Sequence, residues 1–326
     1  MKQLLRKPAR SLERGFVIVA VLWILVALSA LAMIFSVYLS KSARALGAND
    51  IGIQTEALSS ASLELAAYRL QSADEKDRPA QGSFRFRMDD ADVLVTFTSE
   101  AARVDLNKAP KDMLANLFEV LGAEPKAASD IADRIDGWRT QPKTNAAGAN
   151  TNTNTNSNAN YTNSNNEAAL YLAAGRAYEP RQAPFVHVNE LSLVLGISPA
   201  MVERALPFVT IYSQSADIDA LLAAPEVVAA LPGMTPELLN GFLKQRPSLP
   251  RDQKAVAAAL GQIKAAALPD AKAFRVLTTI HFDNGRRTST EAVVSLGREK
   301  DKEPYNILSW QDQAETGDRP VRRAGR

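Results

Sequence analysis

The stretch "ERGFVIVAVLWILVALSALAMIFSVYLSKS", residues Glu13–Ser42, decides how this chain is organised. From Gly15 to Ser40 it contains 26 residues and no charged side chain. As an α-helix with a rise of about 1.5 Å per residue, this run would reach roughly 39 Å, more than a hydrocarbon core of about 30 Å. A cleaved secretory signal has a shorter apolar stretch, of about 7 to 15 residues. The sequence therefore predicts a transmembrane helix over residues 16–40.

The charges that flank the apolar run predict its orientation. Before Phe16 five cations oppose one anion, a net charge of +4, whereas the whole chain carries +2 and the remainder therefore −2. By the positive-inside rule, such a basic flank stays in the cytoplasm. We therefore expect a single-pass inner-membrane protein with a cytoplasmic N-terminus and a periplasmic C-terminal domain. The absence of cysteine excludes disulfides and thiolate sites but leaves the compartment open.

The helical pattern continues beyond the membrane span. Leu46, Ile53, Leu58 and Leu65 recur near helical spacing, and no proline follows the span before Pro79. The pattern predicts one continuous helix of roughly 55 residues. Its second half, residues 41–78, is expected to pack on a globular periplasmic head.

The end of the basic segment resembles the cleavage site of prepilin peptidase. A basic leader, residues 1–15, ends in Arg14-Gly15 and is followed by Phe16. With the long N-terminal helix, this junction resembles the type IV pilin and pseudopilin design. The resemblance implies cleavage between Gly15 and Phe16, with N-methylation of Phe16. A simple membrane anchor stays open at this point, because hydropathy alone does not reject it.

One position departs from that design. If Phe16 is counted as the first mature residue, the fifth is Ala20, where most pilins and pseudopilins carry Glu. That carboxylate is thought to neutralise the free amine of a neighbouring subunit, because an unpaired charge in an apolar filament core is costly. A subunit without it is poorly suited to add beneath an existing subunit, but it can occupy the tip of the stack.

The remaining residues predict an α+β head with a small antiparallel sheet. Residues 79–102 alternate apolar and polar side chains around a turn at Asp89–Asp92, which indicates a hairpin. Residues 269–312 read as closing strands around the turn Asp283-Asn284-Gly285, and we expect them to share one sheet with the hairpin. The polar tail, residues 313–326, is expected to be disordered.

Residues 103–268 predict a large inserted α-helical domain. A plan of helix, glycine-containing turn and helix occurs three times, around Gly122, Gly196 and Gly233. Within this domain, residues 143–166 form a low-complexity Asn/Thr/Ser tract without an apolar period, which predicts a disordered insertion. The three units resemble helix-hairpin-helix elements.

The helix-hairpin-helix likeness raises DNA binding as an alternative. A DNA-binding hairpin usually offers a Gly-x-Gly turn with basic residues nearby, but no second glycine occurs here and Glu124 would repel phosphate. The nearly neutral charge also lacks the electrostatic footprint of a nucleic-acid binder. We therefore expect no nucleic-acid partner. A membrane-anchored periplasmic helix-hairpin-helix protein for DNA uptake is kept as the alternative.

The sequence offers no catalytic constellation, which argues against an enzyme. It has two histidines, His187 and His281, and neither a cysteine nucleophile nor a Gly-rich phosphate loop. His187 precedes a helix and is expected to have a capping or hydrogen-bonding role. The acids Asp89, Asp90 and Asp92 suit a turn better than a calcium loop, because the glycine and the closing Glu of such a loop are missing. We expect no cofactor, and no catalytic, cofactor-binding or metal-binding residue.

Nearly the whole chain resembles the general secretion pathway protein K family, the large minor pseudopilins of type II secretion systems. The likeness rests on the Arg14-Gly15-Phe16 junction without a Glu at the fifth position. It rests also on the order of the segments "EAARVDLNKAP", "FVHVNELSLVLGISPAMVERALPFVTIYS", "LLAAPEVVAALPG" and "PYNILSW".

The family resemblance implies a pseudopilin fold with a large helical insertion. It also implies a tip complex with the minor pseudopilins I and J, which initiates or caps the pseudopilus that exports folded proteins across the outer membrane. Prepilin peptidase, the major pseudopilin, the inner membrane and the inner-membrane assembly platform are the further partners implied. Some relatives bind calcium, but no ligand set can be carried over to this sequence. A minor pilin of a type IV pilus system stays open as another alternative.

Overall fold

The computed structural model describes residues 13–73, 78–141, 167–263, 266–297 and 303–313. Most of the predicted leader, the Asn-rich tract 143–166 and nearly all of the predicted tail lie outside the described residues. The chain forms two compact units, Met1–Ser60 and Ala61–Arg326, which divide within the N-terminal helix.

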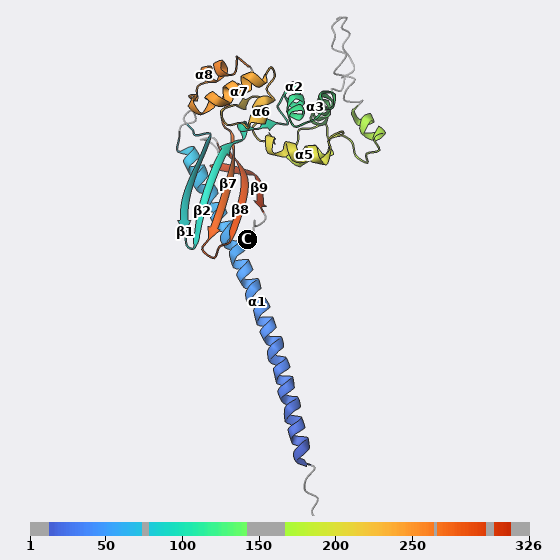
Figure 1. The fold of residues 1–326 in the computed structure, drawn as a ribbon, viewed down its shortest axis with the longest axis vertical. Helices are drawn as coiled ribbons and strands as arrows, with labels where there is room; N and C mark the ends of the chain where they lie inside the picture. Colours follow the sequence, from blue (N-terminus) through green and yellow to red (C-terminus); the bar gives the residue numbers. More distant parts are fainter. Residues whose placement is uncertain (1–12, 74–77, 142–166, 264–265, 298–302, 314–326) are drawn as a thin grey trace, which may run out of the picture. The chain divides into compact units, whose positions relative to one another are not determined.

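The N-terminal helix α1 spans Glu13–Gln71, a length of 59 residues (blue in Figure 1). The predicted continuous helix is therefore confirmed, but it ends at Gln71, whereas the prediction carried it to residue 78. Ser72 follows the last turn, where its backbone N–H and its hydroxyl both donate to the carbonyl of Tyr68, at 2.9 and 2.7 Å. A serine side chain that takes a terminal carbonyl competes with further helix formation.

The second unit contains a five-stranded antiparallel sheet in the order β1-β2-β7-β8-β9 (Figure 1). Its strands are β1 (Gln81–Met88), β2 (Ala91–Ser99), β7 (Ala273–Phe282), β8 (Arg287–Leu296) and β9 (Tyr305–Gln313). The central pair β2–β7 joins segments far apart in the sequence, with Val93 opposite Ile280. The prediction that the hairpin and the closing strands share one sheet is confirmed.

One face of the sheet is apolar, and the last turns of α1 supply a matching stripe. Leu63, Ala66, Ala67 and Leu70 follow helical spacing and are buried. Leu65, which the sequence analysis placed in this stripe, is 40% exposed. That assignment was wrong, because Leu65 is two residues from Leu63 and so lies on a different side of the helix. Arg69 covers the ring of a sheet residue, with its guanidinium carbon 4.2 Å from the centroid of Phe84.

Between β2 and β7 lies a helical region with one continuous apolar core. Its helices are α2 (Lys111–Val120), α3 (Pro125–Arg139), a helical segment at 167–173, α5 (Pro199–Ala205), α6 (Pro225–Ala229), α7 (Pro236–Gln245) and α8 (Gln253–Ala259). Short 3-10 helices are η1 (Glu100–Ala102), η2 (Val188–Leu193), η3 (Leu206–Phe208) and η4 (Arg246–Ser248). Helix α2 begins after Pro110, and the side chain of the nearby Asn107 bonds the backbone of Phe185.

The three predicted glycine turns are confirmed by the backbone. Gly122, Gly196 and Gly233 have φ of 96°, 85° and 85°, values that a side chain disfavours. Each turn leads into a helix whose first residue is proline, which cannot extend the preceding helix but fits a first helical position. The helix–turn–helix around Gly196 differs from the prediction, because its first half is the 3-10 helix η2.

The helical region also contains short strands that the sequence analysis did not predict. Strand β3 (Val104–Asp105) pairs in parallel with β4 (Val209–Thr210), and β5 (Ile218–Asp219) pairs in parallel with β6 (Ala266–Ala267). Two-residue strands have no periodicity to detect, so they form only because the tertiary fold brings their ends together.

A buried ion cluster joins the sheet to the helical region. Glu100, 1% exposed, lies in η1 directly after β2. It accepts hydrogen bonds from Nε of Arg275 at 2.7 Å and Nη2 at 3.2 Å, and from the hydroxyl of Thr210. Arg275 on β7 also pairs with Glu291 on β8. The carboxylate of Glu100 thus ties β7 of the sheet to β4 of the inserted region.

The cluster keeps Arg275 charged in spite of its burial. Burial acts to lower the pKa of Arg275, but the charges and hydrogen bonds of Glu100 and Glu291 raise it above the usual arginine value. The neighbouring Arg103 has a lowered pKa, first because of burial and then because of the charge of Arg275. A paired buried carboxylate of this kind becomes very costly when its partner is removed.

We predict that Arg275→Met destabilises the protein by about 3–5 kcal/mol, because it leaves Glu100 buried without its cation. The matched control is Arg87→Met, since the side chain of Arg87 is 52% exposed in its ion pairs and exposed pairs contribute at most about 1 kcal/mol. Urea unfolding of the detergent-extracted chain, followed by tryptophan fluorescence, measures both. Equal losses for the two variants would show that the buried cluster does not secure the junction.

Candidate functional site

The first part of the candidate site is an apolar segment of α1. Residues Ile18–Lys41 form a span of 24 residues with a mean hydropathy of 2.9, and none of its apolar window is buried within the chain. Across the described ranges, it is the one helix that is long and apolar enough to cross a membrane. Trp23 and Met33 are 71% and 73% exposed. Such a surface needs lipid or other apolar helices around it.

The predicted processing residues lie at the start of α1. Gly15 and Phe16 belong to its first turn, and Ala20 follows Phe16 by four residues. Positions separated by four residues share one side of a helix. The backbone therefore places position 20 one turn from the residue whose amine cleavage would release.

Of the acids in the turn predicted at Asp89–Asp92, Asp92 lies on β2 and pairs with an arginine. Arg87 pairs with Asp92 at 3.1 Å and with Asp283 of the β7–β8 turn at 2.7 Å. The hydrogen bond that Arg87 donates to Asp283, and then the charge of Asp283, raise the pKa of Arg87. In the part of the chain that the structure describes, no group of three or more His, Asp or Glu residues is arranged to hold a metal ion. These acids hold two hairpin turns together.

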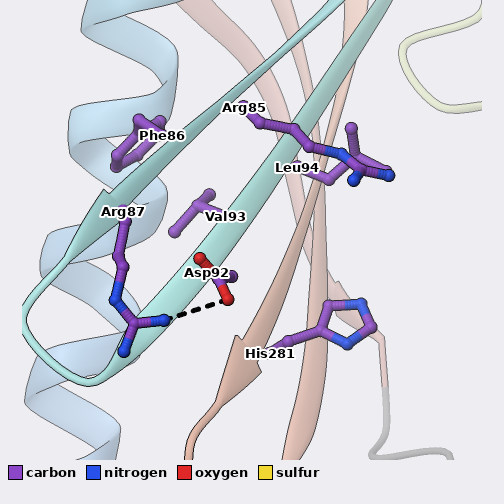
Figure 2. Close-up of a pocket in the computed structure, with 7 residues that line it drawn as sticks. All are labelled: Arg85, Phe86, Arg87, Asp92, Val93, Leu94 and His281. Atoms are coloured by element: carbon purple, nitrogen blue, oxygen red, sulfur yellow. Dashed lines mark hydrogen bonds and ion pairs between the residues drawn. The ribbon is translucent and has the colours of Figure 1, made fainter.

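An open concavity of about 560 Å³ lies beside this ion pair. Figure 2 shows Arg85, Leu94 and His281 on one side of the sheet, and Phe86 on the side of α1. The strand register sets His281 opposite Asp92. The lining is Arg85, Phe86, Arg87, Asp92, Val93, Leu94 and His281, which offers cations and an imidazole but no hydroxyl or thiol nucleophile. This chemistry suits contact with another polar surface better than catalysis.

The other histidine has the capping role that the sequence predicted. His187 precedes η2, and its Nδ1 accepts a hydrogen bond from the backbone N–H of Asn189 at 3.1 Å. His187 lies at the N-cap of η2 and His281 lies on β7, and the two do not form a pair in the described structure.

The first glycine turn is contacted by an arginine of the same chain. Arg204 of α5 donates from Nη1 to the carbonyl of Leu121 at 2.7 Å, and a Cβ on Gly122 would come within 3.2 Å of that guanidinium nitrogen. The turn is therefore engaged by an arginine of its own chain. This use differs from a DNA-binding hairpin, in which the backbone amides of the turn meet phosphate.

Two buried aspartates, which the sequence analysis missed, repeat one loop geometry. Asp105 ends β3 and is 2% exposed, and Asp219 ends β5 and is fully buried. Each carboxylate accepts from the N–H two residues later, at 2.8 Å from Asn107 and at 3.1 Å from Leu221. The main-chain carbonyl of each also accepts from the N–H four residues later. The shared signal in the sequence is "VDLNKAP" beside "IDALLAAP", an apolar residue and Asp followed by Ala-Pro.

The second oxygen of each aspartate reaches another part of the fold. Asp105 accepts from the N–H of Gln214 at 2.8 Å and from the hydroxyl of Ser213 at 3.1 Å, whereas Asp219 pairs with Arg251 at 2.6 Å. Burial raises the pKa of both carboxyls, against the effect of these donors. Both loops therefore act as fixed corners of the helical region and offer no free acid to a ligand.

A further buried acid lies where the Asn-rich tract rejoins the described chain. Glu167 is 3% exposed and pairs with Arg134 of α3. Gly137 makes room for it, because a Cβ there would lie 2.8 Å from its carboxyl carbon. Burial raises the pKa of Glu167, ahead of the lowering effect of Arg134, and its Oε1 has no hydrogen-bond partner among the described residues. The pair anchors the end of the insertion to α3.

Comparisons with known proteins agree on one family. The family model described as type II secretion system (T2SS), protein K, matches residues 94–214. The type II secretion system protein K of Klebsiella pneumoniae is 23% identical over 256 residues, which cover 70% of this chain and 72% of the relative. In the crystal structure of the GspK–GspI–GspJ complex from the type 2 secretion system of enterotoxigenic Escherichia coli, one chain matches with a TM-score of 0.50 and 14% identity. The match covers 79% of this chain and 94% of that one.

The structural match concerns the fold, and the family model and the curated relative concern the family. Together they do not favour the alternatives of a DNA-uptake protein or a type IV minor pilin. They agree with the apolar N-terminal helix, the small antiparallel sheet and the helical insertion. The chain is therefore similar to the protein K family of type II secretion systems, in the family model over residues 94–214 and in the curated relative over 70% of this chain.

Proposed function

We propose that this minor pseudopilin occupies the tip of the pseudopilus in a complex with the minor pseudopilins I and J. There it initiates or caps the filament that exports folded proteins across the outer membrane. It acts as a structural subunit rather than as an enzyme. The E. coli relative was solved in complex with GspI and GspJ, which supports these partners.

The observation that carries the proposal is the exposed apolar span of α1. Lipid and a bundle of neighbouring apolar helices are similar environments, so such a helix can leave the bilayer for a filament without exposing apolar surface to water. Ala20 adds no carboxylate to neutralise the amine of another subunit within that filament. A subunit without this carboxylate fits the end of the stack, where no neighbour above has an amine that needs neutralising.

Orientation and processing complete the proposal. The basic leader keeps the N-terminus in the cytoplasm, and the head lies in the periplasm, anchored in the inner membrane by α1. Prepilin peptidase cuts between Gly15 and Phe16 and leaves an amine on Phe16 that is then methylated. The major pseudopilin and the inner-membrane assembly platform are the remaining partners, and no nucleic acid takes part.

Co-purification tests the proposed complex. The full chain, tagged at its C-terminus and extracted from membranes of secreting cells with a mild detergent, is expected to retain pseudopilins I and J. The control is the same extraction from cells in which the other two subunits carry the tag. A chain that is recovered alone, while I and J are recovered together without it, would contradict the proposal.

N-terminal sequencing tests the processing site. Protein extracted from cells with prepilin peptidase is expected to begin at Phe16, and protein from cells without the peptidase at Met1. The variant Gly15→Leu provides a matched control, because it alters the junction and leaves the apolar span unchanged. A start at Met1 in peptidase-containing cells would remove the basis for transfer of α1 into a filament.

The substitution Ala20→Glu tests the position of the subunit. We expect it to place the protein at internal positions of overproduced pseudopili, as seen by immunogold labelling, because the new carboxylate can neutralise a neighbouring amine. The control Ala30→Glu puts the charge deeper in the span, where it costs about 2.5–3.5 kcal/mol, and should reduce membrane insertion. Unchanged labelling with Ala20→Glu would show that the missing acid does not set the position.

A further inference from the structure

The two edges of the sheet differ in character. Strands β1 and β9 are the outer strands, so each presents unpaired backbone groups on one side in the described part of the chain. Proteins protect such edges with charges, proline or irregular geometry, since a bare edge pairs with other chains. Strand β1, "QGSFRFRM", carries two arginines, and Arg87 is held by two ion pairs.

Strand β9, "YNILSWQDQ", carries fewer charged side chains than β1. Its carboxylate, Asp312, accepts from the indole N–H of Trp310 at 3.1 Å and from the hydroxyl of Thr290 at 3.2 Å, so it is engaged with the sheet. Ile307 and Leu308 are 49% and 39% exposed. A register shift opposite Val293 and Val294 leaves Leu308 without a partner residue on β8. The irregularity thus adds an exposed apolar side chain to the edge rather than a charged one.

Helix α1 extends the apolar edge. The hydroxyl of Tyr305 donates to the carboxylate of Glu64 at 2.9 Å, and the side chain of Gln71 bonds the carbonyl of Pro304. Burial, followed by this bond to Glu64, raises the pKa of Tyr305 to about 12. Because residues 64, 68 and 71 share one stripe of a helix, Tyr68 lies on the side of α1 that meets the start of β9.

Tyr68 is 72% exposed on that side. Tyr68 of α1 and Ile307 and Leu308 of β9 are thus exposed apolar side chains on two elements that the Tyr305–Glu64 bond joins, and they are here named the β9 flank. Exposed apolar groups that gather at one place mark interaction surfaces more often than single ones do.

We propose that the β9 flank is where the head of a neighbouring minor pseudopilin docks, through an extended apolar segment laid along the free edge of β9. The inference rests on the proposed function. The related E. coli chain was solved in complex with GspI and GspJ, which supports this kind of occupant. The edge strand supplies main-chain hydrogen bonds, and the exposed apolar side chains supply the contact area.

Site-specific photo-crosslinking in the full chain tests the docking. The chain has no cysteine, and a photo-reactive residue needs no reactive group on the partner. Benzoylphenylalanine replaces Ile307 on β9 or, as the control, Met88 at the end of β1, which has a matching exposure of 48%. After irradiation of secreting cells, we expect position 307 to form an adduct with pseudopilin I or J. We expect no such adduct from position 88.

Several outcomes would overturn the inference. An adduct of position 307 within its own chain would show that this chain's own segments cover the edge, and an adduct with a second copy would show self-association. Equal adducts from positions 307 and 88 would show no preference for the flank. If the unsubstituted chain retains I and J but position 307 gives no adduct, the inference fails while the proposed function stands. If I and J are not retained at all, both fail.

A charge substitution provides a second measurement. Ile307→Asp is expected to reduce the I and J recovered with the full chain, and Met88→Asp to leave the recovery unchanged. Both sites are half-exposed on edge strands, so neither change empties a core position. Should Ile307→Asp fail to accumulate, the crosslinking result decides alone.

Discussion

An apolar helix that is exposed along its length cannot remain in water, and the other features of this protein follow from that constraint. At roughly 25 cal/mol per Å² of apolar surface, leaving a span such as Ile18–Lys41 hydrated is far more costly than placing it in lipid or among other helices. Either environment penalises an uncompensated charge. The fully uncharged run, with Ala at position 20, is therefore compatible with both environments, whereas a carboxylate there would require a partner. In the proposed function, the head has the separate task of staying folded while this helix moves from lipid into the filament.

In the head, a large helical region is inserted between two neighbouring strands of a small sheet. Strands β2 and β7 pair directly although the whole helical region lies between them in the sequence. Glu100 lies at the exit from β2, where Arg275 and Thr210 both bond its carboxylate, so the entry and the return of the insertion are fixed by one buried group. Inside the insertion, Asp105 and Asp219 repeat one loop geometry. Buried acids that satisfy backbone donors thus set the corners, and apolar packing fills the space between them.

The surface of the head has two kinds of edge. At β1 Arg87 pairs with Asp92 and Asp283, and Arg85 adds a further charge to the strand, which disfavours strand addition. At β9 the polar groups are engaged with the sheet or with α1, and apolar side chains remain exposed. The two edges therefore differ in charge and in apolar exposure, and β9 is better suited than β1 to contact with an apolar neighbour.

The sequence by itself determined the elements whose signals are local. The uncharged run predicted the membrane-length helix, alternation predicted the hairpin, and Gly122, Gly196 and Gly233 marked turns because their backbone conformation excludes most side chains. Only the tertiary structure decided which side of α1 is buried, since Leu65 and Leu63 are equally apolar and the position of the sheet distinguishes them. It also decided the two-residue strands, the buried roles of Glu100, Asp105 and Asp219, and the exposure of Ile307. Each of these depends on residues distant in sequence, whose proximity no local pattern records.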